Sequence, residues 1–266
     1  MTNKMKIAIL GGGNMGGAFA KGISKQLEKC EVIVSDKNSA KLTELKKRTN
    51  IKTVMNNIEA VKGADVVILA VKPQDFEPFL AELKGKIPAH AIVVSIATGV
   101  KIKTIEKGLS HKFIARVVPN LPALINESMS VWIAPNFSPK QKESVKNILK
   151  AIGEEIEMKN ESDINKVTAT SGSGPAYVWY FMENMIKAGV KLGLKEEVAR
   201  KLTIQTFLGA SKMSALNFET EKELRLRVTS KKGTTERAIK TLEKGKFGKL
   251  IEKAIKNAYK RAKELG

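Results

Sequence analysis

The sequence predicts an α/β protein in two parts. A doubly wound, largely parallel sheet covered by helices is expected over residues 1–160, and an all-helical part over residues 161–266. Three observations predict this fold. An apolar run of strand length leads into a glycine-rich turn near the start of the chain. Short apolar runs then alternate with helically spaced apolar residues, as in successive βα units. Beyond residue 160 the apolar residues keep helical spacing throughout.

The glycine turn matches the pattern G-x-G-x-x-G at Gly11, Gly13 and Gly16. Such glycines turn the chain, let the backbone approach a phosphate and let the helix pack on the strand. The first turn of the helix then offers free N–H groups to an anion. The next strand ends at Asp36, twenty positions after Gly16, where an acid that binds ribose is expected. We therefore predict a dinucleotide site, with a purely structural turn as the alternative.

The alternation of strands and helices makes the first part a Rossmann-type domain. One helix is expected to begin with Ser39 or its neighbour as N-cap, and another with a capping box at Ser138 and Gln141. The predicted strands are 7–10, 32–34, 51–54, 66–71, 91–96, 113–118, 129–134 and a short one near Ile156. One predicted helix follows the glycine turn, and a second runs through Leu42 and Leu45. Three more span 76–83, 100–109 and 138–152.

The second part contains two long helices that are too apolar for a simple surface. One carries Val178, Phe181 and Met185 on a broad stripe, and the other carries Leu202 and Phe207. Only about a hundred residues of this part are present to bury them, so we predict that a partner subunit covers these faces. Packing against the chain's own sheet is the alternative.

Composition is that of an ordinary globular protein, with 42% hydrophobic and 28% charged residues. The formal net charge of +20 divides evenly, 25 − 15 = +10 for residues 1–160 and 22 − 12 = +10 for residues 161–266. Because the charge is not gathered into a patch, no nucleic-acid partner is expected. A diffuse positive field does favour capture of small anionic ligands.

Cysteine and histidine exclude several kinds of site. Cys30 is the one cysteine, so an intrachain disulfide is excluded and a reducing cytoplasm is the expected compartment. His90 and His111 are interpreted as residues of surface loops, and no spacing is typical of metal ligands. No apolar run reaches the roughly 18 residues that a membrane span needs. We expect a cytoplasmic protein with no metal and no membrane partner.

Two glycine-rich breaks interrupt the helical part, at residues 171–175 and 228–235. In the second, the backbone N–H groups of Gly233, Thr234 and Thr235 would lie at a helix start, where they can hold a carboxylate. A threonine hydroxyl there can hydrogen-bond a substrate atom. Ordinary N-capping is the alternative for these residues.

Together these motifs resemble those of pyrroline-5-carboxylate reductases over nearly the whole chain. The resemblance lies in the glycine turn with Met15, the segment 70–73, Asn-Leu-Pro at 120–122, Ser-Gly-Ser-Gly-Pro-Ala-Tyr at 171–177, and the segment 228–235. It implies reduction of the cyclic imine 1-pyrroline-5-carboxylate to L-proline, the last step of proline biosynthesis. It also implies a homodimer formed by the C-terminal helices, with decamers as a common larger assembly.

The resemblance also implies roles for individual residues. The Thr235 hydroxyl would reach the ring nitrogen as the catalytic group, and the backbone of Gly233, Thr234 and Thr235 would hold the substrate carboxylate, with Asn120 in the same pocket. On the cofactor side the pyrophosphate would lie on Gly13, Asn14 and Met15, within the turn shaped by Gly11 and Gly16. The ribose would lie near Asn57, and the nicotinamide along Ala70, Val71, Lys72, Pro73 and Ala97.

Two departures and two rival functions qualify this reading. Lys231 and Lys232 stand where the family usually has Pro-Gly. At the end of the second strand, Asp36 suits the 2′-hydroxyl of NADH, whereas Ser35, Lys37 and Asn38 suit the 2′-phosphate of NADPH, the cofactor we favour.

A β-hydroxyacid dehydrogenase would need a catalytic lysine where Val178 stands. A nucleotide-sensing or nucleic-acid-binding module is the rival that is not an enzyme.

Overall fold

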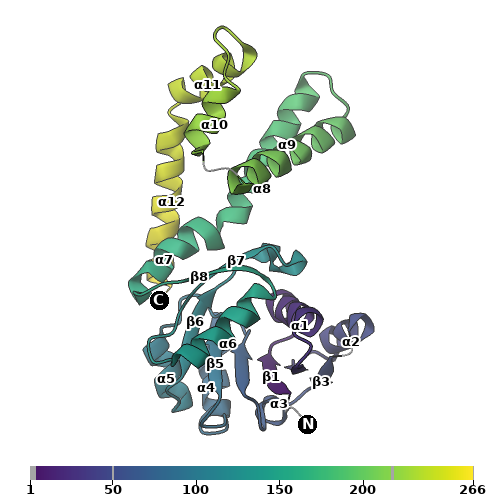
Figure 1. Cartoon of the computed structure of the whole chain (residues 1–266), viewed down its shortest axis with the longest axis vertical. Helices are drawn as coiled ribbons and strands as arrows, with labels where there is room; N and C mark the ends of the chain where they lie inside the picture. Colours follow the sequence, from purple (N-terminus) through teal and green to yellow (C-terminus); the bar gives the residue numbers. More distant parts are fainter. Residues whose placement is uncertain (1–3, 50, 217–218, 266) are drawn as a thin grey trace. The chain divides into compact units, whose positions relative to one another are not determined.

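The computed structural model describes residues 4–49, 51–216 and 219–265. Contacts divide the chain into two compact units. The first comprises Met1–Ser173 together with Ala258–Gly266, and the second comprises Gly174–Asn257. The first unit contains the sheet, and the second is built from helices (Figure 1). The division predicted near residue 160, from the last short strand and the change to helical spacing, stays a prediction.

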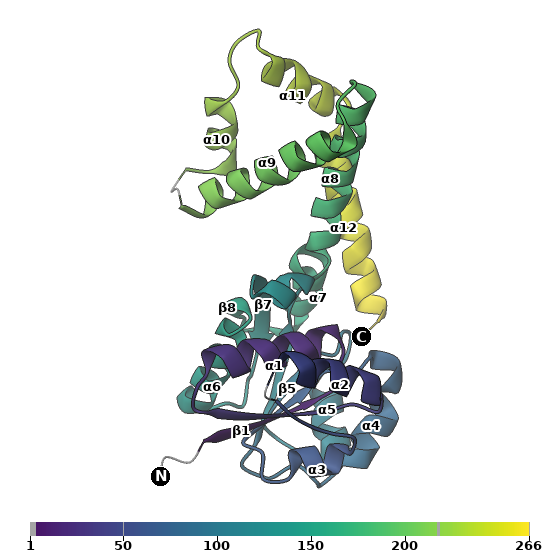
Figure 2. The same ribbon diagram turned by 90° about the vertical axis from the view of Figure 1, so that its right-hand side faces the viewer.

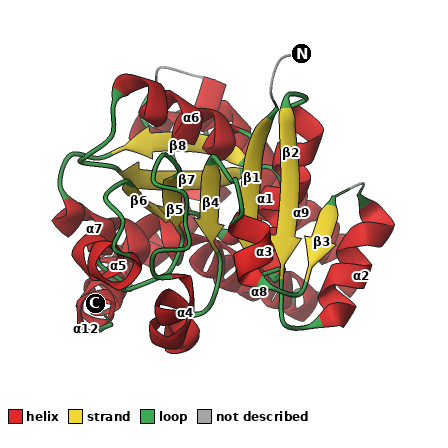
Figure 3. Cartoon of the chain, turned by 90° about the horizontal axis from the view of Figure 1, so that it is seen from below, coloured by secondary structure: helices red, strands yellow, loops and turns green. Residues whose placement is uncertain are grey.

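One eight-stranded sheet forms the centre of the first unit, as Figure 3 shows in yellow. Its strand order is β3-β2-β1-β4-β5-β6-β7-β8. All neighbours pair in parallel except β6 and β7, which are antiparallel. The predicted strands and the largely parallel sheet are therefore confirmed. The strands are β1 (Met5–Leu10), β2 (Cys30–Ser35), β3 (Lys52–Val54), β4 (Val66–Leu69), β5 (Ile92–Ser95), β6 (Ile114–Val118), β7 (Ser128–Ile133) and β8 (Gly153–Glu157).

The order of the central strands positions the site. The chain builds outward from β1 to β2 and β3, and then returns to the other side of β1 with β4. The connections after β1 and β4 therefore diverge to opposite sides, and a crevice forms outside their carboxyl ends. In doubly wound sheets this switch point is where ligands bind. The glycine turn follows β1 at this place.

Helices cover both faces of the sheet and bury two hydrophobic clusters. One cluster joins β1 residues such as Ile7 and Ile9 to Phe19, and it continues to Trp132 and Leu149. The other collects the alternate side chains of the same strands against a second set of helices. The first set is α1 (Asn14–Gln26), α2 (Ser39–Arg48) and α6 (Pro139–Lys150), and the second is α3 (Asn57–Val61), α4 (Phe76–Leu83) and α5 (Ile102–Leu109).

The two predicted helix starts show the expected capping. The capping box at Ser138 and Gln141 is present at the start of α6. Asn38, the neighbour of Ser39, is the N-cap of α2, and its side chain accepts a hydrogen bond from the N–H of Ala40. The sequence reasoning missed α3, where Asn56 is the N-cap. It also missed several short turns: η1 (Pro73–Asp75), η2 (Leu121–Ile125), η3 (Glu161–Asp163), α7 (Ile164–Val167) and η4 (Thr168–Gly172).

The second unit has a small core and open apolar faces. Phe181 contacts both Phe207 and Phe247, with ring centroids 5.8 Å apart in each pair. Trp179 is 50% exposed and Leu202 is 55% exposed. Within the described residues of the second unit these side chains are therefore exposed. The helices are α8 (Gly174–Lys191), α9 (Glu196–Leu216), α10 (Glu221–Arg227), α11 (Thr234–Lys244) and α12 (Phe247–Glu264), whose last residues belong to the first unit. None of the described helices is long and apolar enough to cross a membrane.

The prediction of a surface position for His111 was wrong. Its side chain is buried, its Nε2 lies 2.7 Å from the backbone oxygen of Ala91, and its ring lies edge-on to Phe113. The backbone carbonyl satisfies one ring nitrogen, so a histidine is tolerated there. His90 is exposed, as expected, and lies 3.4 Å from Asp65.

A partly buried ion pair joins β6 to η3, and its carboxylate also bonds to the start of α5. The Nη1 of Arg116 donates to Oε1 of Glu161 at 2.9 Å, and the same oxygen accepts the N–H of Ile102 at 2.9 Å. The Arg116 side chain is only 5% exposed, and its Nε is buried without a partner among the described residues. Arg116 therefore depends on Glu161 for the neutralisation of its charge.

We expect Glu161→Ala to lower the free energy of unfolding by about 2–3 kcal/mol, because it leaves the Arg116 charge buried and unpaired. The matched control is Lys166→Ala, which removes the exposed pair of Lys166 with Asp163 and should cost less than about 0.5 kcal/mol. Urea unfolding followed by circular dichroism measures both. Equal effects of the two substitutions would contradict the role given to Glu161.

Candidate functional site

The glycine turn brings the backbone after β1 against the backbone after β4. Gly11 adopts a φ of +112°, and a Cβ added to it would lie 2.5 Å from the backbone oxygen of Ala70. The N–H of Gly11 donates to the backbone oxygen of Ser35 at 2.7 Å. A side chain at position 11 would clash and would also be strained. Glycine is therefore required where three strands end side by side.

The start of α1 has the features of an anion site. Gly13 is its N-cap and provides no side-chain hydrogen bond, and the first turn contains no acidic residue. A Cβ added to Gly13 would meet no atom within 4 Å, so the space above the helix start is open. At Gly16, by contrast, a Cβ would lie 1.8 Å from the backbone oxygen of Gly11. Gly16 lets the helix approach the turn, and Gly13 leaves room for a ligand on free N–H groups.

A cavity of about 380 Å³ opens at this edge of the sheet. It brings together most of the residues predicted to bind the cofactor: Gly11, Gly13, Ser35, Asp36, Lys37, Asn57, Ala70, Val71 and Lys72. It is also lined by Lys41, Gln74, Asp75 and Phe79, which the sequence reasoning missed. Lys41 could have been found from its place in the first turn of α2, since the helix after β2 begins at the same edge.

The remaining predicted cofactor residues lie around this cavity or outside it. Asn14 lines a second cavity of about 240 Å³ that shares Gly13 and Lys41 with the first. Met15 is half-buried against the core, and Ala97 is buried in the other hydrophobic cluster. Pro73 begins η1, and its side chain lies outside the described part of the structure.

Asp36 and its neighbours are held by a network of hydrogen bonds. The Asp36 Oδ2 accepts the N–H of Gly12 at 2.8 Å, and its Oδ1 accepts the N–H of Asn38 at 2.8 Å. The Nζ of Lys41 lies 3.3 Å from the same Oδ2. Ser35 is fully buried, and its hydroxyl donates to Oδ1 of Asn57 at 2.7 Å. The acid expected on the ribose is thus bonded to the glycine turn itself.

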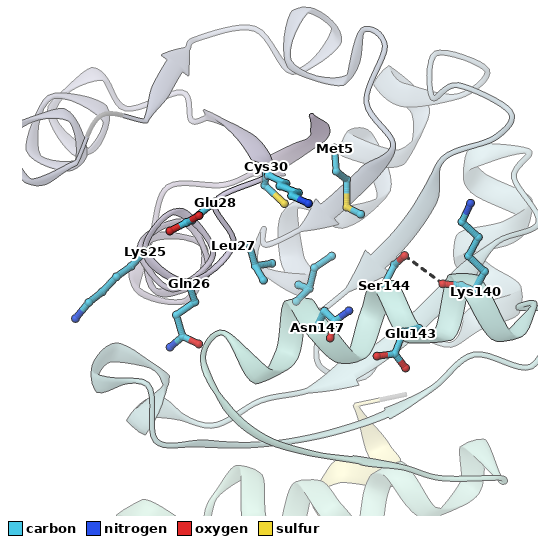
Figure 4. A pocket seen from close by; sticks show the side chains of 12 residues that line it. Met5, Lys25, Gln26, Leu27, Glu28, Cys30, Lys140, Glu143, Ser144 and Asn147 are labelled. Carbon is cyan, nitrogen blue, oxygen red and sulfur yellow. Dashed lines mark hydrogen bonds between the residues drawn. The ribbon is translucent and has the colours of Figure 1, made fainter. Parts of the chain in front are cut away.

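A larger cavity, about 620 Å³, lies at the other end of the strands (Figure 4). Met5 and Cys30, the first residues of β1 and β2, are on one side of it, and Ser144 and Asn147 of α6 are on the other. Burial raises the pKa of the Cys30 thiol, which keeps it protonated. Ligands of doubly wound sheets bind at the carboxyl ends of the strands, so the smaller cavity is the candidate site.

Asn120 connects three segments of the first unit. Its Oδ1 accepts the N–H of Met129 at 3.1 Å, and its Nδ2 donates to the backbone oxygen of Ser171 at 3.3 Å. Its own N–H donates to the hydroxyl of Ser128 at 3.2 Å. Both ends of the amide are therefore engaged in joining the end of β6 to β7 and η4.

The predicted carboxylate site lies at the start of α11, in the second unit. Gly233 is the N-cap without a side-chain hydrogen bond, and Thr234 and Thr235 form the first turn (Figure 2). A Cβ added to Gly233 would lie 2.4 Å from the hydroxyl oxygen of Ser230. Like α1, α11 begins at a glycine without a side-chain cap, but its first turn contains the acid Glu236 and the first turn of α1 contains none. Uncapped N–H groups at a helix start suit a small anion.

Lys232, one of the two departures from the family pattern, adopts a φ of +62°. This left-handed conformation favours glycine, which is the residue that the family usually has there. The N–H of Lys232 donates to Oε2 of Glu236 at 2.8 Å. Hydrogen bonds from Lys240 and from this N–H hold the pKa of Glu236 below its usual value. The bond to Glu236 helps a lysine keep a backbone path suited to glycine.

The described residues contain no cluster of three or more histidines, cysteines or acids that could hold a metal ion. The candidate site offers backbone N–H donors, lysines and small polar side chains, and Asp36 and Asp75 also line its cavity. The N–H groups and the lysines suit an organic anion.

Comparison with known proteins identifies relatives along the whole chain. A family model described as pyrroline-5-carboxylate reductase dimerisation matches residues 161–265. A second, described as NADP oxidoreductase coenzyme F420-dependent, matches residues 6–99. The pyrroline-5-carboxylate reductase of Pseudomonas aeruginosa is 39% identical over 98% of this chain and 96% of its own length.

Solved structures agree with these relatives. A pyrroline-5-carboxylate reductase from Coxiella burnetii is 36% identical, with a TM-score of 0.92 and 99% of both chains covered. The Plasmodium falciparum pyrroline carboxylate reductase with NADP bound is 29% identical, with a TM-score of 0.88 and 100% of both chains covered. The chain, from the glycine turn to its last helix, belongs to the pyrroline-5-carboxylate reductase family.

Proposed function

We propose that this chain is a pyrroline-5-carboxylate reductase, which transfers hydride from NADPH to the imine of 1-pyrroline-5-carboxylate and yields L-proline. The match to reductases of this name over almost the whole chain carries the proposal. The chain's own residues fit it, because an uncapped helix start lies beside a cavity at the switch point of the sheet. The nicotinamide supplies the hydride when it is bound.

The cofactor is NADPH, with NADH as the alternative. In this proposal the pyrophosphate lies over Gly13, Asn14 and Met15, where the helix start offers free N–H groups. The ribose lies near Ser35, Asp36, Lys37 and Asn57, and the nicotinamide lies along the segment 70–73 and Ala97. NADP in the Plasmodium relative supports the preference. The residue roles rest on the family resemblance and on the shared cavity.

The substrate needs an anion site and a group for its nitrogen. The N–H groups of Gly233, Thr234 and Thr235 hold the carboxylate, and Asn120 also serves substrate binding, as the family resemblance implies. The hydroxyl of Thr235 hydrogen-bonds the ring nitrogen. A protonated imine is already electrophilic, so positioning and charge stabilisation suffice and a strong general acid is dispensable. We also propose that residues 1–160 serve the cofactor and residues 161–266 serve the substrate and the dimer.

The apolar faces of α8 and α9 belong to a subunit interface. The match to a dimerisation family supports a homo-oligomer. We propose a homodimer through the C-terminal helices, with a decamer as the larger assembly and the cytoplasm as the compartment. The exposed Trp179 and Leu202 are typical of a surface that a second copy covers. Sedimentation of the native chain at the mass of one chain, 29.1 kDa, would contradict the dimer.

A β-hydroxyacid dehydrogenase is not favoured. Its lysine is expected four residues after Gly174, where Val178 stands. The relatives reported above are pyrroline-5-carboxylate reductases. A nucleotide sensor would bind the cofactor without oxidising it, whereas the reductase oxidises NADPH when the imine substrate is added.

The native chain should oxidise NADPH when 1-pyrroline-5-carboxylate is added, and faster than it oxidises NADH at equal concentration. Absorbance of the reduced nicotinamide measures both rates, and NADP⁺ with a 3-hydroxy acid is the comparison reaction. Turnover of the hydroxy acid alone would assign the chain to the dehydrogenases. Absence of turnover with either substrate would favour a sensor.

Gly13→Ala and Gly16→Ala should separate cofactor binding from folding. The Cβ at position 13 enters open space where the pyrophosphate lies, so we expect the KM for NADPH to rise about tenfold or more, with a loss of stability within about 1 kcal/mol. The Cβ at position 16 meets backbone, so stability should fall by more than about 2 kcal/mol. Calorimetric unfolding and steady-state kinetics measure these effects. Unchanged NADPH binding in Gly13→Ala would remove the helix start from the site.

Thr235→Ala should lower kcat by about 10- to 100-fold, because a hydrogen bond to a charged nitrogen is lost, while the KM for NADPH changes less than about twofold. Thr235→Ser should keep most of the activity. Thr241→Ala is the matched control on α11, since the Thr241 hydroxyl bonds only within the helix, to the backbone oxygen of Arg237, among the described contacts. If Thr235→Ala left kcat unchanged, Thr235 would have no part in catalysis.

A further inference from the structure

The Asp36 carboxylate already accepts hydrogen bonds from the protein backbone. In sites that select NADH, the acid at this position accepts hydrogen bonds from the ribose hydroxyls. Here both oxygens accept backbone N–H groups, from Gly12 and Asn38, at 2.8 Å each. Its side chain is only 11% exposed. Asp36 therefore stabilises the glycine turn and the start of α2, and its capacity for a 2′-hydroxyl is reduced.

One of the three residues predicted to bind a 2′-phosphate has its donor engaged elsewhere. The Ser35 hydroxyl is fully buried and donates to Asn57. The Oδ1 of Asn38 accepts the N–H of Ala40 at 2.9 Å as the cap of α2, and this bond uses the acceptor of the amide rather than its NH₂ donor. Lys37 is exposed and lines the cavity. A further cation at this edge would add to these donors, and the sequence pattern did not reveal one.

Lys41 has the position and the charge for that role. It lines both cavities beside the glycine turn. Its side chain is 48% exposed, and its Nζ lies 3.3 Å from Oδ2 of Asp36. An ammonium group has three donors, so the contact with Asp36 leaves two for a ligand. Asp36 and Asp75 line the same cavity and would repel a phosphate, and the Lys41 charge beside Asp36 offsets that repulsion.

We infer that Lys41 is the residue that selects NADPH, by binding the 2′-phosphate with its ammonium group while Asp36 holds that group at the mouth of the cavity. The inference rests on the proposed use of a nicotinamide cofactor. Lys41 touches the cofactor and is a specificity residue. Asp36 acts through Lys41 and the glycine turn as a positioning residue.

The test is calorimetric binding of NADP⁺ and NAD⁺ to the full-length native chain and to Lys41→Met, which keeps the aliphatic stem. NADP⁺ should bind about 10- to 100-fold more weakly to the variant, because a charge-assisted contact is lost, while NAD⁺ affinity should change less than about twofold. Lys41→Arg should restore NADP⁺ binding. Lys47→Ala, on the same helix but outside the residues that line either cavity, should change neither affinity.

The 2′,5′-ADP fragment isolates the phosphate from the rest of the cofactor. It should follow NADP⁺ in every variant, whereas 5′-AMP should follow NAD⁺. Equal weakening of both dinucleotides in Lys41→Met would mean that Lys41 only supports the turn, and it would overturn the inference while the proposed function stands. Unchanged NADP⁺ binding would also overturn it. Binding of neither dinucleotide by the native chain would overturn the proposed function itself.

Discussion

The site of this protein depends on the contact of backbone with backbone where β1 and β4 end. Gly11 lies against the carbonyl of Ala70, and Gly16 lies against the carbonyl of Gly11. No side chain fits at either contact, so the strand, the turn and the helix come together more closely than other residues permit. The helix start, the end of β2 and the cavity are all positioned by that approach. The free N–H groups of α1 are a candidate anion site because the turn brings them to the edge of the sheet.

The two units differ in how much of their apolar surface they bury. In the first, alternate side chains of the same strands enter two hydrophobic clusters, one on each face of the sheet. In the second, three phenylalanines form the ring contacts of a small core, and broad stripes on α8 and α9 stay exposed. A chain that belongs to a family with a dimerisation region can leave such stripes for another copy to cover. Membership in the pyrroline-5-carboxylate reductase family therefore accounts for a feature that the single chain leaves unsatisfied.

Sequence reasoning predicted the strands well because buried parallel strands are continuous apolar runs, and that signal depends on neighbouring residues only. It missed α3 and the turns around η4 because these are a few residues long and lack a repeating pattern. It misplaced His111 because the partner that makes burial tolerable, the carbonyl of Ala91, is twenty residues away in the chain. It noted that Lys232 stands where glycine is usual in the family. The structure shows why glycine suits this position, because the backbone there is left-handed.

The sequence by itself determined the fold class and the family, because glycine spacing, apolar periodicity and short motifs are local properties. Only the tertiary structure decided which polar groups remain available at the candidate site. Asp36 was predicted for the ribose hydroxyl and Ser35 for the 2′-phosphate, yet their side chains already hydrogen-bond to Gly12, Asn38 and Asn57. Lys41 was not predicted and lines the cavity. Hydrogen-bond partners depend on which distant segments approach each other in the fold, and the spacing of residues along the chain does not show this.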